Sequence, residues 1–169
     1  MTHSKLPELM LAVHPTSRGF GWVLFEGPLV PVDWGIASAK GKRSAQGMVR
    51  FKQLIDQYRP SVLVLEKYEE DDSNRGERIR TIAQTMRGFA NSHDMDTPIY
   101  GREEVRVAVT GNLRASRHTV ARAVAERLPI LRHRLPVARK LWQSDDRQQC
   151  LFDAAALGIT HYILTNPRT

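Results

Sequence analysis

The sequence of 169 residues contains one cysteine, Cys150, and no long apolar run. A single cysteine cannot form an intramolecular disulfide bond. No apolar run approaches the roughly 20 residues that span a bilayer. The N-terminus also lacks the basic, apolar and small-residue succession of a secretory signal. We therefore expect a soluble cytoplasmic protein with no membrane partner.

Acidic residues are fewer than basic ones, with 18 Asp and Glu against 25 Lys and Arg and a formal net charge of +7. Such a surface attracts nucleic acid, although a merely solvated basic surface gives the same total. A run of four acidic residues at positions 69–72 follows Glu66, whereas many of the basic residues are concentrated in one third of the chain. These basic residues are Arg102, Arg106, Arg114, Arg117, Arg122, Arg127, Arg132, Arg134, Arg139 and Lys140. This segregation fits a phosphate groove beside a cation site.

Apolar patterning in the first part of the chain predicts strands and then a helix. Three short strands are predicted at residues 9–13, 20–25 and 33–37, the first two forming a hairpin. From residue 42 the apolar side chains fall on one helical face until Pro60. The uninterrupted apolar run at residues 62–65 predicts a central strand covered on both faces.

The second part of the chain predicts mainly helices. Residues 79–90 repeat apolar side chains at spacings of three and four, which is typical of an amphipathic helix. A short strand around Ile99 and a short helix at residues 103–109 follow. Ser116 has the chemistry of an N-cap for a further helix that Pro129 ends.

The last part combines a loop and a helix. Residues 131–140 are basic and interrupted by proline, so we expect a loop, and the final helix is expected to start near Asp145. The whole order of elements predicts a mixed sheet with helices on its faces. The length predicts a single domain over residues 1–169.

Chemically active side chains follow the predicted strands. If the first and fourth strands are parallel neighbours, His14 and Glu66 emerge side by side at the carboxyl edge of the sheet, where ligand sites cluster. The final helix adds Asp146, Cys150 and Asp153 on one face, at steps of four and three. Carboxylate oxygens suit hard divalent cations, which can bridge a scissile phosphate.

Four stretches of the sequence occur together in an informative order. They are residues 11–21 (LAVHPTSRGFG), 63–66 (LVLE), 105–116 (VRVAVTGNLRAS) followed by Val120, and 153–159 (DAAALGI). In this order they resemble the first hairpin, the glutamate strand, the phosphate-contacting segment and the last-carboxylate helix of the RuvC family of Holliday-junction resolvases. The resemblance implies an α/β, RNase H-like fold. Its mixed central sheet would combine a three-stranded antiparallel meander with parallel strands and be flanked by helices.

The chain departs from this family pattern at two catalytic positions. His14 corresponds to the first aspartate, which bridges both metal ions, and Cys150 to the acidic residue or histidine one turn before the last aspartate. Glu66 and Asp153 are unchanged. Imidazole is a poor Mg²⁺ ligand and cannot bridge two hard cations. Mn²⁺ would tolerate a mixed shell better, and Asp146 could lend another carboxylate.

Several candidates also have purely structural interpretations. His14 could be a loop residue bonded to backbone, Asp146 an N-terminal helix charge, and Cys150 a small buried hydrophobe. Tyr68 resembles in position, one residue early, the loop aromatic that stacks at a junction. It could equally be a packed loop tyrosine.

The expected nucleic-acid contacts come from the basic third of the chain, although a solvated helix face would give the same pattern. They are Arg102, Arg106, Arg114, Ser116 and Arg117, in addition to Tyr68.

The predicted function is a metal-dependent endonuclease on branched DNA such as four-way junctions. Glu66, Asp153 and Asp146 would hold Mg²⁺ or Mn²⁺, and His14 would act as ligand or general base. The alternative is a catalytically silent module that binds branched or structured nucleic acid through its arginines. An actin-like or sugar-kinase fold is excluded by size, because it needs a second lobe. The resemblance implies a homodimer, since a junction needs two nicks.

Overall fold

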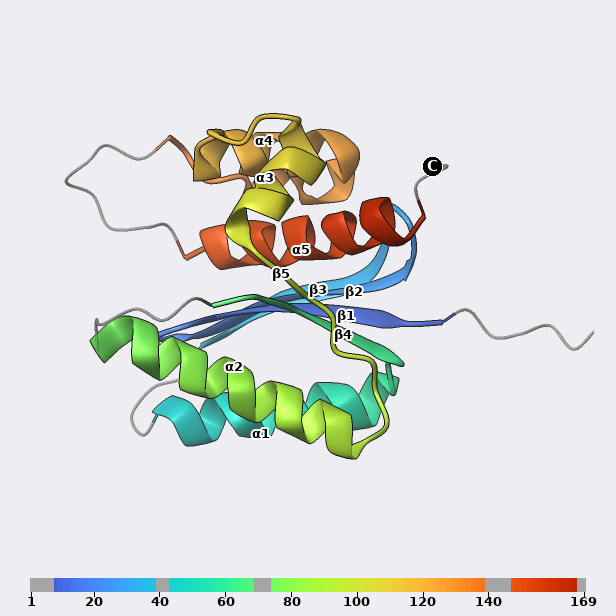
Figure 1. Cartoon of the computed structure of the whole chain (residues 1–169), viewed down its shortest axis with the longest axis vertical. Helices are drawn as coiled ribbons and strands as arrows, with labels where there is room; N and C mark the ends of the chain where they lie inside the picture. Colours follow the sequence, from blue (N-terminus) through green and yellow to red (C-terminus); the bar gives the residue numbers. More distant parts are fainter. Residues whose placement is uncertain (1–7, 39–42, 69–73, 139–146, 167–169) are drawn as a thin grey trace, which may run out of the picture.

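A mixed five-stranded sheet lies between two layers of helices in the computed structural model, which describes residues 8–38, 43–68, 74–138 and 147–166 (Figure 1). The strands are β1 (Met10–Thr16), β2 (Gly19–Gly27), β3 (Val30–Ser38), β4 (Val62–Glu66) and β5 (Ile99–Tyr100). Their order across the sheet is β3-β2-β1-β4-β5. The first three pair antiparallel, and β4 pairs in parallel with both β1 and β5. The predicted combination of a meander with parallel strands is confirmed.

The helices divide between the two faces of the sheet (Figure 1). They are α1 (Arg43–Tyr58), α2 (Asn74–Ser92), α3 (Arg102–Thr110), α4 (Arg117–Arg127) and α5 (Gln149–Thr165), with a short 3-10 helix η1 (Pro129–Arg134) after α4. α1 and α2 pack on one face, and α5 covers the other with α3 and α4 above it. None of the described helices is both long and apolar enough to cross a membrane.

The alternation of side chains along β1 and β4 decides which residues reach the site. Ala12 and Val64 belong to the core beneath α5, whereas the residues on either side of them pack toward α1 and α2. Since side chains alternate along a strand, His14 and Glu66 fall on the α5 side. The parallel register pairs Ala12 with Val64, and two residues further along it brings His14 opposite Glu66.

α5 lies close to the sheet because small residues stand at the contact. A Cβ on Gly21 of β2 would come within 2.3 Å of the Cys150 carbonyl oxygen, and one on Gly158 within 2.4 Å of the Phe25 ring. Neither position has room for a side chain. This close packing brings Asp153, in the middle of α5, within reach of the end of β1.

Two sequence-based expectations need correction. β1 continues to Thr16, so His14 lies inside a strand and not just beyond one. The expected loop at residues 131–140 begins inside a helix, because η1 extends to Arg134 and fully buries Leu131. Proline at the start of η1 fits a helix N-terminus, which the loop prediction overlooked.

Other expectations about the elements are confirmed. The Ser116 hydroxyl caps α4 and accepts a hydrogen bond from the Thr119 backbone N–H at 3.1 Å. The short helix expected at residues 103–109 is α3. The last helix, however, begins at Gln149 and not near Asp145, because residues 147 and 148 form a turn. Asp145 and Asp146 themselves lie outside the described residues.

Candidate functional site

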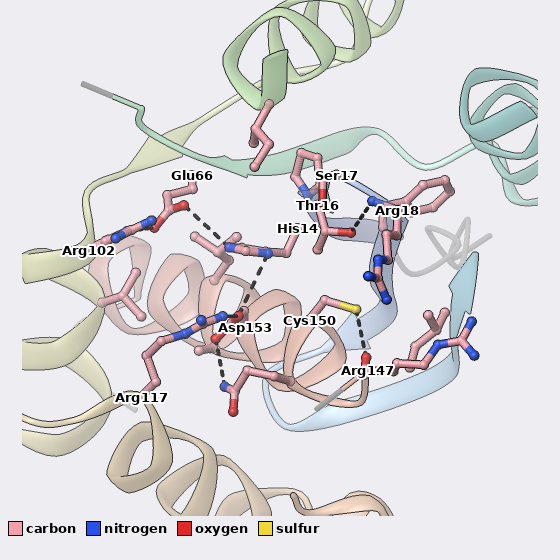
Figure 2. A pocket seen from close by; sticks show the side chains of 18 of the residues that line it. His14, Thr16, Ser17, Arg18, Glu66, Arg102, Arg117, Arg147, Cys150 and Asp153 are labelled. Atoms are coloured by element: carbon pink, nitrogen blue, oxygen red, sulfur yellow. Dashed lines mark hydrogen bonds and ion pairs between the residues drawn. The ribbon is translucent and has the colours of Figure 1, made fainter. Parts of the chain in front are cut away.

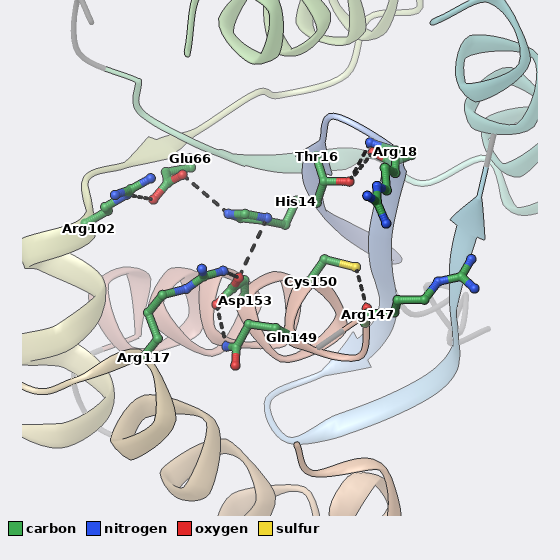
Figure 3. Close-up of polar contacts among 11 residues, drawn as sticks. His14, Thr16, Arg18, Glu66, Arg102, Arg117, Arg147, Gln149, Cys150 and Asp153 are labelled. Atoms are coloured by element: carbon green, nitrogen blue, oxygen red, sulfur yellow. Dashed lines mark hydrogen bonds and ion pairs between the residues drawn. The ribbon is translucent and has the colours of Figure 1, made fainter. Parts of the chain in front are cut away.

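His14 lies between the two acidic side chains that the sequence singled out (Figure 3). Its Nε2 is 3.4 Å from Oε2 of Glu66, and its Nδ1 is 3.8 Å from Oδ2 of Asp153. The three side chains come from β1, β4 and α5, and they are only 14%, 8% and 15% exposed. The structure thus brings together three of the four predicted catalytic residues. The fourth, Asp146, lies outside the described residues.

Each carboxylate also pairs with an arginine (Figure 3). Arg102, at the start of α3, donates from Nε to Oε1 of Glu66 at 3.0 Å. Arg117, at the start of α4, donates to Oδ2 of Asp153. Gln149, one turn before Asp153, donates to its other oxygen at 3.1 Å. Both carboxylates therefore face organic cations.

The charges of the cluster reinforce one another. Burial opposes protonation of His14, but the negative charges of Asp153 and Glu66 outweigh it and raise the pKa of the imidazole above its ordinary value of 6.5. Burial would raise the pKa of Glu66, but its contacts with His14 and Arg102 lower it below 4.5. The contacts therefore favour an imidazolium beside a carboxylate.

The buried polar atoms that lack a hydrogen-bond partner also favour a protonated His14. In the described part of the chain, His14 Nδ1 and Glu66 Oε2 are buried without a hydrogen-bond partner. A neutral imidazole has one N–H donor, whereas an imidazolium has two. Protonation of His14 would give both ring nitrogens a donor role toward the carboxylates on either side.

The donor set does not fit the pair of divalent ions that the family resemblance implies. Among the residues that the structure describes, no three His, Cys, Asp or Glu side chains are arranged to hold a metal ion. The two ring nitrogens of His14 face different carboxylates, so the ring occupies the gap between them. Hard cations prefer several oxygen ligands, and here both carboxylates contact arginines.

The cluster lies in a pocket of about 680 Å³ at the carboxyl ends of β1 and β4 (Figure 2). Five arginines line it, and they are Arg18, Arg102, Arg106, Arg117 and Arg147. In Figure 2, Arg18 and Arg147 lie on the opposite side of His14 from Arg102 and Arg117. A pocket with this lining suits a polyanion that is longer than one phosphate group.

The residues predicted to contact nucleic acid do not all line the pocket. Arg102, Arg106 and Arg117 line the pocket, whereas Arg114 and Ser116 lie outside its lining, exposed on the segment before α4. Tyr68 is half-buried, and its buried hydroxyl has no hydrogen-bond partner among the described residues. Burial, followed by the charge of Glu66, raises the pKa of this hydroxyl. The placement fits the packed-tyrosine alternative.

Cys150 has the structural role that the sequence suggested. Its side chain is 7% exposed, and Sγ donates to the Arg147 carbonyl at 3.2 Å. Burial raises the pKa of the thiol to about 11. Such a thiol is almost entirely protonated at neutral pH and is therefore a poor nucleophile.

Sequence reasoning missed three pocket residues. Gln149 stands four residues before Asp153, so helical spacing would have found it. Arg18 follows the first strand of the hairpin, and Arg147 donates to the Ser38 hydroxyl at 2.6 Å. These two arginines are far apart in sequence, and only the folded sheet brings them to one pocket.

The comparisons with known proteins agree with this architecture. No family model and no curated sequence matches the chain. Thermus thermophilus RuvC in complex with a Holliday junction substrate superposes with a TM-score of 0.71 at 16% identity, covering 95% of this chain and 96% of that one. A second T. thermophilus RuvC structure gives a TM-score of 0.67 at 18% identity, with 93% and 96% covered.

A eukaryotic protein has a similar structure. The yeast mitochondrial Holliday junction resolvase Ydc2 superposes with a TM-score of 0.59 at 11% identity, covering 98% of this chain and 84% of that one. The mixed sheet and its helical layers define an α/β protein of the RNase H-like class. Within that class, the chain has a RuvC-like fold.

Proposed function

We propose that this chain binds branched DNA, with four-way junctions as the substrate class, through the arginine-lined pocket. The observation that carries the proposal is the cluster itself, in which Arg102 and Arg117 stand beside the carboxylates of Glu66 and Asp153. Arginine is well suited to phosphate, because its guanidinium presents paired donors. The likeness to a RuvC in complex with a junction supports the choice of branched DNA.

We further propose that the pocket does not cleave DNA by the two-metal route. That route needs oxygen ligands that hold both cations and bridge them. The imidazole of His14 stands at the position where the family resemblance expects the bridging aspartate. Glu66 and Asp153 contact arginines there. The site therefore favours the catalytically silent module over the endonuclease that the sequence favoured.

A metal-dependent endonuclease is the second candidate. Its support is that Glu66 and Asp153 both lie within 4 Å of the same imidazole, so two of the expected carboxylates do converge. A transition-metal ion such as Mn²⁺ accepts mixed imidazole and carboxylate ligands better than Mg²⁺ does. Under either candidate, a homodimer stays a prediction from the family resemblance.

The test compares binding with cleavage on one substrate. A labelled four-way junction and a linear duplex of the same sequence are incubated with the wild-type chain, Glu66→Ala and His14→Asp, in Mg²⁺, Mn²⁺ or EDTA. We expect the wild type to bind the junction more tightly than the duplex and to leave it intact under every condition. Cleavage by His14→Asp alone would support a silenced site.

Two results would contradict the proposal. Cleavage by the wild type in Mn²⁺, lost in Glu66→Ala, would establish the endonuclease instead. Equal affinity for junction and duplex would remove branched DNA as the substrate class.

A further inference from the structure

Two guanidinium groups and an imidazole stand where the family resemblance expects divalent ions. Arg102 pairs with Glu66, Arg117 pairs with Asp153, and His14 lies between the two carboxylates. The two guanidinium groups balance the two carboxylates, and the imidazole of His14 adds no negative charge where an aspartate would. A phosphodiester carries one negative charge, and two bare carboxylates would repel it.

Arg102 can contact Glu66 and an anion at the same time. Its ion pair with Glu66 uses Nε, at 3.0 Å, and its side chain is 70% exposed. A guanidinium has five N–H donors in a planar fork, so the terminal amino groups are outside this contact. Arg106, one helical turn further along α3, lines the same pocket. An entering phosphate therefore meets fixed donors on the α3 side.

We infer that this pocket holds a DNA phosphodiester without a divalent ion, with Arg102, Arg117 and the His14 imidazole in the place of the metal ions. The inference rests on the proposed function and adds what balances the phosphate charge. Glu66 and Asp153 then anchor guanidinium groups. Because the cations belong to the chain, the pocket needs no metal to accept its ligand.

The test measures junction binding with and without an oxygen-preferring cation. The anisotropy of a labelled four-way junction is followed in EDTA and in Ca²⁺ at constant ionic strength. We expect the Kd of the wild type to differ by less than about threefold between the two conditions. Tightening by about tenfold or more in Ca²⁺ would overturn the inference, because a bound cation would then balance the charge.

His14→Asp supplies the complementary result. This variant replaces the imidazole with a third carboxylate, so we expect its binding in EDTA to weaken by about tenfold or more and to recover in Ca²⁺. Lys52→Glu is the control, because it also introduces a carboxylate in place of a basic side chain, on an exposed part of α1 outside the pocket. Equal effects of the two substitutions in EDTA would contradict the inference.

Arg102→Gln tests the inference without adding a carboxylate to the site. Arg102 is exposed, so its loss leaves the core intact, and circular dichroism checks the fold. We expect weaker junction binding in EDTA that Ca²⁺ restores only in part, and unchanged binding would contradict the inference. Failure of the proposed function is a separate result, since the wild type would then bind junction and linear duplex equally.

Discussion

At the scale of single residues, position 14 decides what kind of site the pocket is. An aspartate there would place three carboxylates beside one another, whose mutual repulsion favours a bound cation or a raised carboxyl pKa. Histidine removes one negative charge and can add a positive one at the same point. Arg102 and Arg117 supply the rest of the positive charge. One strand position thus changes the electrostatics of the whole cluster while the fold is kept.

The contact between His14 and Glu66 predicts a pH dependence of stability. The pKa of His14 is raised in the folded chain, so its contribution is fully present below its unfolded value of 6.5 and is lost as the pH rises through the raised pKa. The pKa of Glu66 is lowered, so its contribution is present above 4.5 and lost as the pH falls through the lowered pKa. The pair therefore stabilises the fold most between these two unfolded values.

Urea unfolding of the wild type and His14→Gln checks this linkage. We expect the wild type to exceed the variant in free energy of unfolding at about pH 6, and the difference to shrink by about pH 9. Other histidines are present in both proteins, so their titration cancels in the difference. A difference that stays constant over this range would contradict a raised pKa for His14.

Cys150 gives a second prediction at this scale. A pKa of about 11 against an ordinary 9.0 lowers the thiolate fraction near neutral pH by about 100-fold. The native thiol should therefore react with iodoacetamide at least about 100-fold more slowly than the thiol in urea. Since Cys150 is the single cysteine of the chain, mass spectrometry of the whole protein measures its rate directly. Equal rates would show that the thiol is accessible.

The sequence predicted the three central residues of the site, but not the pairing of its carboxylates with arginines. His14 and Glu66 follow apolar runs whose parallel pairing brings them together. Asp153 stands at helical spacing from Cys150 on the last helix. The pairing of each carboxylate with an arginine depends on the relative placement of α3, α4 and α5. That placement results from packing between elements distant in sequence, and no local pattern records it.

At the scale of elements, hydrophobic periodicity predicted the type of each strand and α-helix but not all boundaries. β1 extends beyond its apolar run because Pro15 and Thr16 still pair with β2. η1 escaped prediction because a short 3-10 helix has too few turns to show a period. The family resemblance predicted the antiparallel meander and the parallel strands, whereas the place of β5 beside β4 is known only from the structure.

Two glycines in helices should respond in opposite directions to the same substitution. Gly158 in α5 packs on Phe25, where a Cβ would be 2.4 Å from the ring, while nothing lies within 4 Å of a Cβ at Gly88 in α2. Overpacking costs about 1–3 kcal/mol, whereas alanine improves on glycine in a helix by up to about 1 kcal/mol. We expect Gly158→Ala to lower the free energy of unfolding and Gly88→Ala to raise it.

Urea titrations of the two variants test this opposition with helix propensity held constant. Both substitutions add one methyl group to a helix, so any difference in sign comes from the contact with β2. Stabilisation by both would show that α5 lies further from the sheet than these contacts require.

At the scale of the whole molecule, the pocket lies at one edge of the sheet, at the carboxyl ends of β1 and β4. It is lined by residues of α2, α3, α4, α5, β3 and the hairpin of β1 and β2. The arginines of the pocket come from four separate parts of the chain. A net charge of +7 attracts DNA from any direction, but this convergence gives the pocket a local excess of positive charge.

The salt dependence of junction binding should locate the DNA on this side of the molecule. Each phosphate neutralised by a basic residue contributes about 0.9 to the slope of log affinity against log salt concentration. Arg106 lines the pocket, so Arg106→Gln should reduce this slope by about 1. Because phosphates carry no sequence information, the variant should also weaken binding equally for junctions of different central sequence. Lys52→Gln removes the same charge on exposed α1, outside the pocket lining, and should keep the wild-type slope. A lowered slope in the Lys52 variant, with none in the Arg106 variant, would place the DNA against α1 instead of the pocket.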